Sequence, residues 1–504
     1  MILIGGGAAI NVLLINPETE RFSRSVTLPL GLLSIASYLS FHGYSVRLYD
    51  RVVEKESLET VAEAFVPDVV GVSLVSYKSI ADVCFVSEFF KKQGIPVIWG
   101  GPLASELPEV SLKNACVDAI SVGEGEQTWL ELVQACQRHE TDWSQIPGLV
   151  IRDPDGNALY TPDRPFLDLG ILPETDWSFI DVPKYFQSSY GCKRMLYLYA
   201  AKGCPHNCSF CYNKDFHKCR YRKRPMEHVL HEIRFLVETY DMDGIYFADE
   251  LWCRNVREMH ETCDSLKSLG LNFVWGCQTR IGLFGEEDFR YMYDAGCRWI
   301  FFGVESGSPR ILEQMNKRIA YDKIEQTFID CKAAGIVAIG SFIIGYPGET
   351  AQDTKQTIAL IERLPTKLIN FNYFIAIPGS DIYQRLVDEK RHPGISDFQT
   401  LEVQDPMGTL LYNFSELTDR EIKVIYSHYM WRSFTTSDLV VDGEKSSFTK
   451  KVILDALHTA LFSVKNGEFG AFLSYLWFSG VSFLRILFYA KAFPSVKKRF
   501  GIKH

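Results

Sequence analysis

The sequence has no excess of basic residues. Among its 504 residues, 53 Lys and Arg stand against 62 Asp and Glu, and the net charge is −9. Proteins that bind nucleic acid present a basic surface to the phosphate backbone, so this balance argues against nucleic acid as a partner. One local basic stretch, residues 218–224, could still bind a phosphate group. The composition favours a small or lipophilic substrate.

The first residues lack the basic region of a secretory signal peptide. Residues 1–7 are apolar or glycine and lead directly into a predicted strand. The chain contains 13 Cys, and in a reducing compartment such thiols persist as metal ligands or as small buried side chains rather than as disulfides. We therefore expect a cytoplasmic protein.

The C-terminal region lacks an uncharged run long enough to cross a membrane unaided. Residues 469–484 carry no charge, and Glu468 and Arg485 flank them. A helix of these sixteen residues would measure about 24 Å, less than the roughly 30 Å of the hydrocarbon core. We expect a packed helix that caps a substrate pocket or a helix that associates peripherally with a membrane surface. A true span would bury Arg485.

Length and the 47% hydrophobic content predict more than one core and about three domains. In residues 1–145, short apolar runs alternate with helical patterns, which is typical of a doubly wound, Rossmann-like parallel sheet in an α/β protein. The five predicted strands lie at residues 12–15, 46–49, 69–73, 97–99 and 119–122.

Turns rich in small residues follow these strands, where the ligand of such a sheet lies. Small side chains let the backbone approach a flat or phosphate-bearing ligand closely. The candidate binding residues are Leu30, Gly31, Ser73, Ser76, Gly100, Gly101, Gly123, Glu124 and Gly125.

The remaining chain divides into three further predicted regions. Residues 146–190 are rich in Pro and turn signals and predict a linker with a hairpin at residues 148–160. Residues 191–400 contain six strand-like runs separated by helix-length segments, which predicts a partial (β/α)6 barrel. Residues 401–504 have helical periodicity.

Three cysteines, Cys204, Cys208 and Cys211, stand in one short run after the first predicted barrel strand. Thiolates are soft ligands that select iron–sulfur clusters or zinc. Three thiolates can hold a four-iron cluster and leave one iron open for chemistry, because a complete cage uses four. The alternative is a zinc site completed by His206, Cys192 or Cys219.

The spacing Cys-x3-Cys-x2-Cys, with an aromatic residue before the last Cys, resembles the cluster loop of the radical S-adenosylmethionine (radical SAM) superfamily. A preceding α/β domain with small-residue turns resembles the cobalamin-binding domain of one radical SAM class. The chain departs from cobalamin domains that ligate cobalt through Asp-x-His-x-x-Gly, since residues 16–20 read Asn-Pro-Glu-Thr-Glu. If cobalamin binds, histidine is not expected to hold its lower face.

The resemblance also implies a SAM site at the carboxyl ends of the barrel strands, where such enzymes place their chemistry. A zwitterionic adenosine ligand needs carboxylates for its ammonium group, polar groups for its ribose and small residues beside its base. The resemblance assigns Asp249 and Glu250 to the amino group, and Gln278 and Arg280 to the region near ribose and carboxylate. It assigns Glu305 and Ser306 to the ribose or carboxylate side, and Gly345, Pro347 and Gly348 to the adenine side.

The implied function is that of a cobalamin-dependent radical SAM enzyme with a [4Fe-4S] cluster, in the group of hopanoid methylases, phosphinate methylases and magnesium-protoporphyrin ester cyclases. By that resemblance, SAM is cleaved reductively to a 5′-deoxyadenosyl radical, and methylcobalamin supplies a methyl group to an unactivated carbon of a lipophilic substrate. An electron donor such as flavodoxin or ferredoxin would be required. Two alternatives stay open: a cyclase that transfers no methyl group, and a non-catalytic iron–sulfur or tetrapyrrole carrier.

Overall fold

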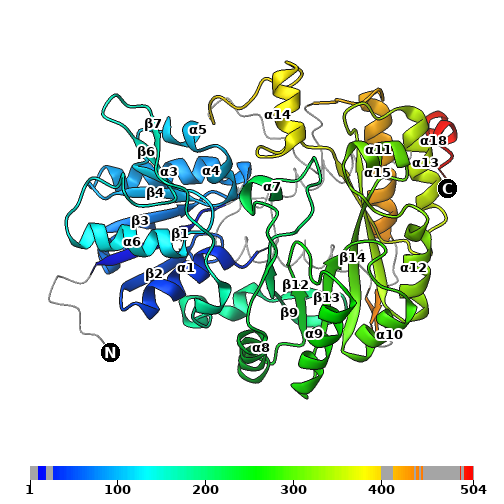
Figure 1. Cartoon of the computed structure of the whole chain (residues 1–504), viewed down its shortest axis with the longest axis horizontal. Coiled ribbons are helices and arrows are strands. Elements are labelled where there is room, and N and C mark those ends of the chain that lie inside the picture. Colours follow the sequence, from blue (N-terminus) through cyan, green and yellow to red (C-terminus); the bar gives the residue numbers. More distant parts are fainter. Residues whose placement is uncertain are drawn as a thin grey trace. The chain divides into compact units, whose positions relative to one another are not determined.

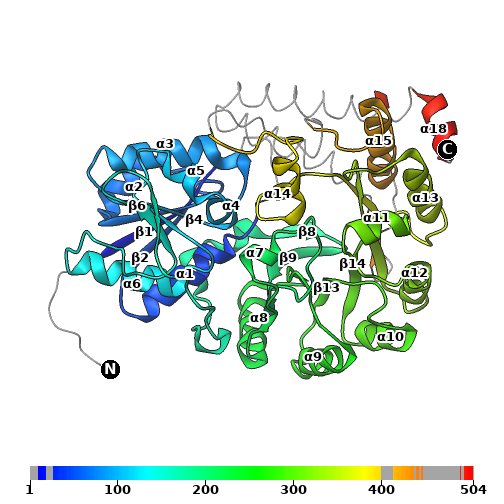
Figure 2. The same cartoon turned by 45° about the horizontal axis from the view of Figure 1, so that its top comes forward.

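The computed structural model describes residues 10–18, 26–398, 412–435, 439–441, 444–446, 488–489 and 493–502. The chain forms two compact units. The first comprises Met1–Tyr185 with the short segments Asp215–Lys218 and Pro393–Val403, and the second comprises most of the rest. Figure 1 shows the chain in sequence colours, and Figure 2 shows it after a turn of 45°. The domain boundaries predicted above remain a proposal.

The first unit is built on a seven-stranded sheet with the order β2-β1-β3-β4-β5-β6-β7. Its first five strands pair in parallel, and β6 and β7 join as an antiparallel hairpin. The strands are β1 (Asn11–Asn16), β2 (Ser45–Asp50), β3 (Val69–Ser73), β4 (Val97–Gly100), β5 (Ala119–Ser121), β6 (Leu149–Arg152) and β7 (Ala158–Tyr160). The predicted doubly wound sheet is confirmed, and the hairpin extends it.

Helices cover both faces of this sheet, with α1 and α6 on one side and α3 on the other (Figure 1). They are α1 (Leu30–Phe41), α2 (Leu58–Phe65), α3 (Ile80–Lys91), α4 (Pro102–Glu106), α5 (Pro108–Leu112) and α6 (Glu126–Gln137). Packing is tight at Gly71 in β3, where an added Cβ would lie 2.5 Å from the ring of Trp129 and 2.8 Å from Leu14. Only glycine leaves room for the indole of α6 against the sheet.

The second unit is built on another seven-stranded sheet, in the order β16-β15-β14-β13-β12-β9-β8. All neighbours from β9 to β16 pair in parallel, and β8 pairs antiparallel with β9. The strands are β8 (Gln187–Ser189), β9 (Cys192–Leu198), β12 (Gly244–Phe247), β13 (Val274–Thr279), β14 (Cys297–Glu305), β15 (Val337–Ile344) and β16 (Ile369–Tyr373). The six predicted barrel strands are confirmed, and the barrel is open because its edge strands do not pair.

The helices of this unit follow the strands in the expected alternation. They are α7 (Asn213–Phe216), α8 (Met226–Tyr240), α9 (Val256–Ser268), α10 (Glu286–Asp294), α11 (Pro309–Gln314), α12 (Lys323–Ala333), α13 (Ala351–Ile361), α14 (Asp381–Asp388), α15 (Asp419–Thr435) and α18 (Pro494–Phe500). Two further strand pairs are antiparallel: β10 (Ala201–Lys202) pairs with β11 (Arg222–Lys223), and β17 (Leu439–Val441) forms a hairpin with β18 (Glu444–Ser446). This hairpin was not predicted by the helical periodicity of the C-terminal region.

Alternation along the strands sorts side chains between the two faces of the curled sheet. Phe302 of β14 points outward, where its ring lies 6.3 Å from Phe289 and 5.5 Å from Phe328. Trp299, on the opposite face, packs in a buried cluster with Met195 and Ile339. Core packing on both faces therefore fixes the strands whose ends carry the polar residues.

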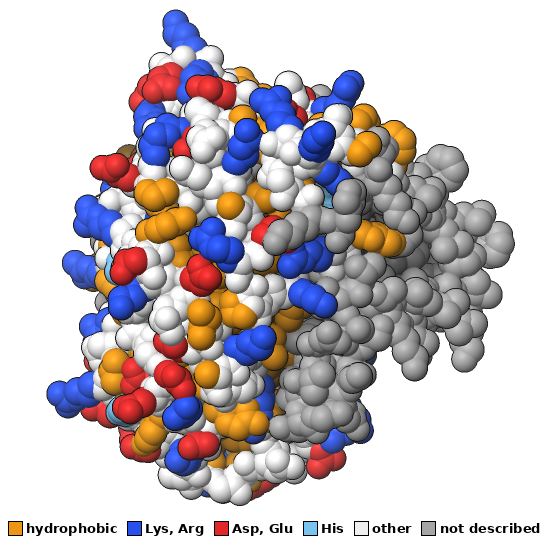
Figure 3. Space-filling view, turned by 90° about the vertical axis from the view of Figure 1, so that its right-hand side faces the viewer, with side chains coloured by type: hydrophobic (Ala, Val, Ile, Leu, Met, Phe, Trp, Pro, Cys, Tyr) orange, Lys and Arg blue, Asp and Glu red, His pale blue; other side chains and the backbone are white. Residues whose placement is uncertain are grey.

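The outer helical face of the second unit carries mixed charge. Figure 3 shows Lys and Arg side chains interspersed with Asp and Glu over this face. Interspersed charges of both signs keep a surface soluble without making a field that attracts one class of ligand. Within the described residues, no helix is long and apolar enough to cross a membrane, and the predicted capping or interfacial helix at residues 469–484 lies outside them.

Candidate functional site

The three predicted cluster cysteines lie together in the loop that follows β9 and β10. Cys208 is buried, and Cys204 and Cys211 are half-buried. Asn213 holds the loop from within, because its amide donates to the carbonyl oxygens of Cys204 (2.7 Å) and His206 (3.1 Å). Its Oδ1 accepts the backbone N–H of Cys204 at 3.0 Å. The loop is therefore shaped by hydrogen bonds that leave the thiols available.

Zinc ligation by Cys192 does not fit this geometry. Cys192 begins β9, whereas the loop follows the carboxyl end of that strand, about 20 Å away at 3.3 Å per residue. Cys219 lies nearer and directs its Sγ at the carbonyl oxygen of His206, 3.6 Å away. Among the residues described, no group of three or more His, Cys, Asp or Glu is placed to hold a single metal ion.

The charge around the loop suits a cluster of thiolates. The Nη1 atom of Arg280 lies 3.8 Å from the Sγ of Cys208, and its Nη2 atom donates to the carbonyl oxygens of Lys317 and Arg318. Burial, followed by the positive charges of Arg280 and Lys317, lowers the pKa of His206 to about 4. Burial raises the pKa of the Cys204 thiol, and the positive charges of Arg280 and Lys317 partly offset that rise, toward the thiolate form that ligates iron. The donor set and its field fit an iron–sulfur cluster.

Asp249 follows β12 and is buried at 1% exposure. Its Oδ1 accepts backbone N–H groups from Ala200 (2.8 Å) and Ala201 (3.1 Å), and its Oδ2 has no hydrogen-bond partner among the described residues. Burial raises the pKa of this carboxyl well above its usual value. An ammonium group would satisfy the second oxygen and favour the ionised form, so the residue fits the predicted contact to SAM.

The neighbouring predicted residues also lie at the strand ends. Glu250 accepts the backbone N–H of Gly203, one residue before Cys204, at 2.8 Å. Gln278 of β13 donates to the carbonyl oxygen of Asp249 at 2.5 Å. These bonds connect the predicted amino-group and ribose regions directly to the cluster loop. They show that both side chains have structural partners besides any ligand.

Glu305 and Ser306 end β14 but face different partners. Glu305 forms an ion pair with Lys317 at 2.7 Å, and both side chains are at most 10% exposed. Ser306 instead contacts Thr357 of α13, with 3.2 Å between the hydroxyl oxygens, and accepts the backbone N–H of Ser308 at 3.1 Å. Ser306 therefore joins β14 to α13, and the structure gives it a packing role.

The predicted adenine-side turn, residues 345–348, is held by a carboxylate that sequence reasoning missed. Glu349 accepts the backbone N–H groups of Gly345 (2.7 Å) and Tyr346 (3.3 Å) and the hydroxyl of Thr354 (2.8 Å). Both Gly345 (φ 85°) and Gly348 (φ 75°) adopt left-handed backbone that favours glycine. These two glycines, three residues apart directly after a strand, were a usable signal for a tight turn and for the acid that follows it.

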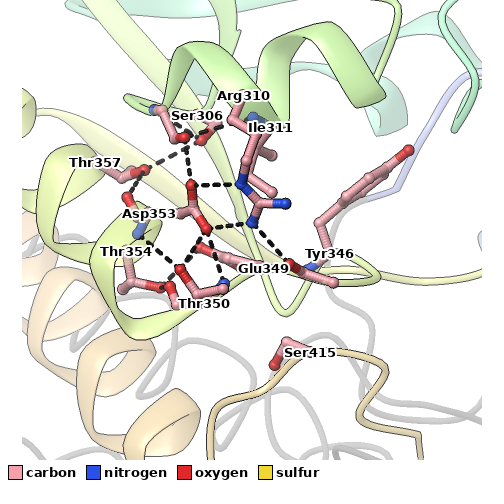
Figure 4. Close-up of polar contacts among 12 residues, drawn as sticks. Ser306, Arg310, Ile311, Tyr346, Glu349, Thr350, Asp353, Thr354, Thr357 and Ser415 are labelled. Carbon is pink, nitrogen blue, oxygen red and sulfur yellow. Dashed lines mark hydrogen bonds and ion pairs between the residues drawn. The ribbon is translucent and has the colours of Figure 1, made fainter.

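Behind this turn lies a second polar network (Figure 4). Asp353 forms an ion pair with Arg310 and accepts hydrogen bonds from Ser308 (2.6 Å) and from the backbone and hydroxyl of Thr350 (2.9 and 2.6 Å). Thr350 caps α13, and Arg310 also donates to the carbonyl oxygen of Gly348 at 2.8 Å. The network therefore fixes the turn to α11 and α13.

In the first unit, the predicted cobalamin residues lie at the carboxyl edge of the sheet. The glycines among them differ in whether a side chain would have room there. Gly31 and Gly123 have no atom within 4 Å of an added Cβ, so space adjoins them. Gly101 and Gly125 are glycines for packing reasons, since a Cβ there would meet Leu74 and Ile35. Leu30, Ser73, Ser76, Gly100 and Glu124 are half-buried at the same edge.

One further residue at this edge was not predicted. Ser121 ends β5 and is buried at 2% exposure, and its hydroxyl has no hydrogen-bond partner among the described residues. A buried hydroxyl without a partner is unfavourable unless a ligand or water completes it. The edge thus offers space beside glycine and an unsatisfied polar group, which fits a bound cofactor such as cobalamin.

Comparison with known proteins identifies two domains in the chain. The sequence matches the radical SAM superfamily over residues 198–361 and the B12 binding domain over residues 23–133. It is 28% identical to an uncharacterised methyltransferase of Pyrococcus horikoshii over 386 residues, which cover 74% of this chain and 83% of the relative. It is 27% identical to the anaerobic magnesium-protoporphyrin IX monomethyl ester cyclase of Rubrivivax gelatinosus over 433 residues, covering 83% and 77%.

A solved structure shares the fold of the chain. The radical S-adenosylmethionine methyltransferase TsrM from Kitasatospora setae, with tryptophan and a SAM analogue bound, superposes with a TM-score of 0.65 at 18% identity, covering 76% of each chain. Because one chain carries both matches, and its curated relatives align across most of their own length, the protein belongs to the cobalamin-dependent radical SAM enzymes, and the predicted [4Fe-4S], SAM and cobalamin cofactors are confirmed.

Proposed function

We propose that this enzyme methylates an unactivated carbon of a small lipophilic substrate. The observation that carries the proposal is the B12 binding match at residues 23–133, which places a methyl-carrying cofactor in the same chain as a radical SAM site. The methyltransferase relative, matched over 83% of its length, supports this reading over others. The cofactors, when bound, would supply the reductive cleavage of SAM and the transferable methyl group.

The chain's own residues would then hold and orient these groups. Cys204, Cys208 and Cys211 would ligate three irons, and Arg280 would support their negative charge from 3.8 Å. The unpartnered Oδ2 of Asp249 would receive the SAM ammonium group, with no change in the two backbone bonds to Oδ1. The turn at residues 345–348, held by Glu349, would lie beside the adenine ring. These roles follow from the strand-end positions and remain part of the proposal.

Half-buried aromatic rings support a lipophilic substrate. The rings of Tyr197 (β9) and Tyr246 (β12) meet edge to face at 5.4 Å, and Tyr246 meets Phe301 (β14) at 5.5 Å. The three side chains share one face of the sheet, the face opposite Phe302 and its helices. Aromatic rings that keep some exposure on an inner face offer apolar contact area to a substrate.

The rival reaction is ring closure without methyl transfer, which the cyclase relative makes relevant. SAM labelled in its methyl group separates the two. We expect label in the product, together with 5′-deoxyadenosine, when anaerobically reconstituted enzyme is given reductant and extracts of candidate substrates. An unlabelled product formed alongside 5′-deoxyadenosine would favour the cyclase reading. Cys208→Ala serves as the matched control, because it should form neither.

Two further features of the proposal depend on sequence alone. A one-electron donor such as flavodoxin or ferredoxin is required by the reductive cleavage. Peripheral contact with a membrane would come from residues 469–484, which lie outside the described residues. Vesicle co-sedimentation of the full chain, compared with a chain that lacks residues 469–484, tests the second feature.

A further inference from the structure

Lys317 is a buried cation beside the cluster loop, and it pairs with Glu305, a residue of the predicted SAM site. It is 7% exposed, and its Nζ donates to Glu305 at 2.7 Å. The ammonium group also lies 5.8 Å from the ring centre of Phe210, the residue before Cys211. Burying an ion pair costs desolvation free energy. A buried pair next to a redox centre is therefore expected to have a function there.

The segment that carries Lys317 is bonded to the cysteine loop itself. The carbonyl oxygen of Met315 accepts the backbone N–H of Ser209 at 2.9 Å. The side-chain amide of Asn316 donates to the carbonyl oxygen of Asn207 at 2.9 Å. The position of the ammonium group relative to the cysteines is therefore fixed.

The local backbone is built around the pair. Glu305 has φ 69°, an unusual value for a residue with a side chain, and the pairing of β14 with β15 shifts register between Gly303 and Glu305. A Cβ at Gly303 would lie 2.5 Å from Oε1 of Glu305 and 2.8 Å from Nζ of Lys317. Strain and a required glycine both serve to admit this ion pair.

We propose that the Glu305–Lys317 pair sets the reduction potential of the cluster held by Cys204, Cys208 and Cys211. This inference rests on one part of the proposed function, namely that the three cysteines hold an iron–sulfur cluster. Reduction adds one negative charge to a site that three thiolates already make negative, and a nearby cation stabilises the reduced form. Glu305 offsets most of the charge of Lys317, so the pair keeps the potential low while holding the loop in place.

The test is a redox titration of the reconstituted enzyme without SAM, followed by electron paramagnetic resonance of the reduced cluster. Glu305→Gln leaves the ammonium group unopposed, and we expect the reduced-to-oxidised ratio at a fixed potential to rise at least tenfold, a shift of 59 mV for one electron. The double variant Glu305→Gln with Lys317→Met removes both charges. Its potential should return to within threefold of the wild-type ratio.

Glu362→Gln is the matched control. Glu362 also forms an ion pair, with Arg432 at 2.6 Å. It directly follows the C-terminal end of α13, about 16 Å along the helix axis from the N-terminal end of that helix, which lies next to the turn at residues 345–348. It should leave the potential unchanged. Iron content and the cluster spectrum report loading in every variant.

Two results overturn the proposal and leave the cluster assignment intact. The first is a Glu305→Gln potential equal to that of wild type. The second is a double variant shifted as far as the single one, since the rise would then not come from Lys317. Wild-type protein without a four-iron signal contradicts the cluster assignment, and the proposal with it. Unshifted potentials in an enzyme that still methylates its substrate would refute only the role of the ion pair.

Discussion

Glu349 is a buried carboxylate through which we expect pH to act on this fold. Burial raises its pKa to about 7 from a model-compound value of 4.5, although the hydrogen bonds from Thr354, Gly345 and Tyr346 oppose the rise. The negative charge of Asp353 adds to it. Between those two pKa values the folded protein keeps a proton that the unfolded chain releases.

A raised folded-state pKa means that this contribution to stability is fully present below about pH 4.5 and is lost as pH rises through 7. Linkage with these two pKa values gives a loss of about 2 to 3 kcal/mol between pH 5 and pH 8. Glu349→Gln removes the titrating group and keeps an oxygen for the backbone N–H groups of Gly345 and Tyr346. At about 2 to 4 °C per kcal/mol for a unit of this size, the wild-type melting temperature should fall about 5 to 10 °C more than that of the variant.

Thermal melts of full-length protein at pH 5, 6, 7 and 8 would measure this difference. Asp353→Asn is the control, because Asp353 is ionised across that range: hydrogen bonds from Arg310 and Ser308 lower its pKa even though burial opposes them. The contribution of Asp353 is lost only in acid, below its usual pKa. Its replacement should therefore lower the melting temperature at every pH, with a much smaller change between pH 5 and pH 8 than Glu349→Gln shows, because the charge of Asp353 is only the smallest of the named contributions to the pKa of Glu349. Parallel profiles for wild type and Glu349→Gln would refute the reasoning.

Further expectations concern the cofactor sites and the core. Cys208→Ala should abolish 5′-deoxyadenosine formation and leave cobalamin absorbance after gel filtration unchanged, because the two cofactors have separate ligands; cleavage surviving in this variant would be incompatible with the cluster loop. Asp249→Asn should weaken SAM binding at least tenfold by calorimetry, with melting changed little since Oδ1 keeps its backbone bonds; a large melting loss with normal SAM affinity would assign the residue to the fold instead. Gly71→Ala should cost about 1–3 kcal/mol by overpacking against Trp129, measured by urea unfolding, whereas Gly31→Ala should be tolerated.

Much of the fold was predictable because the strands of both sheets are buried on two faces. Short apolar runs bounded by turn residues are typical of buried strands and too short for helices, as at Val69–Ser73 and Val337–Ile344. The hairpin at β17 and β18 was missed because it lies within a stretch of helical periodicity. Its few residues carry too little pattern to compete with that signal.

The candidate site was predictable where chemistry is local in sequence. The spacing of Cys204, Cys208 and Cys211 identifies them as candidate ligands, because a single loop brings all three to one cluster. Lys317 and Ser121 could not be found this way. Lys317 acquires its role from a contact with Glu305 twelve residues earlier, and Ser121 from burial at a strand end. Lysine and serine at such positions are ordinarily solvated surface residues.

Two ion pairs near the strand ends of the second unit differ in burial and in what surrounds them: the Arg310 side chain is 46% exposed beside Asp353, whereas Glu305 and Lys317 are both at most 10% exposed. The Arg310–Asp353 pair is joined by Ser308, Thr350 and the Gly348 carbonyl (Figure 4), so hydrogen bonds satisfy both ions and the pair can serve packing alone. The Glu305–Lys317 pair instead requires left-handed backbone at Glu305 and adjoins a loop of thiols. Strain of this kind persists only where surrounding structure enforces it. An electrostatic effect on the neighbouring cysteines therefore explains the second pair better than stability does.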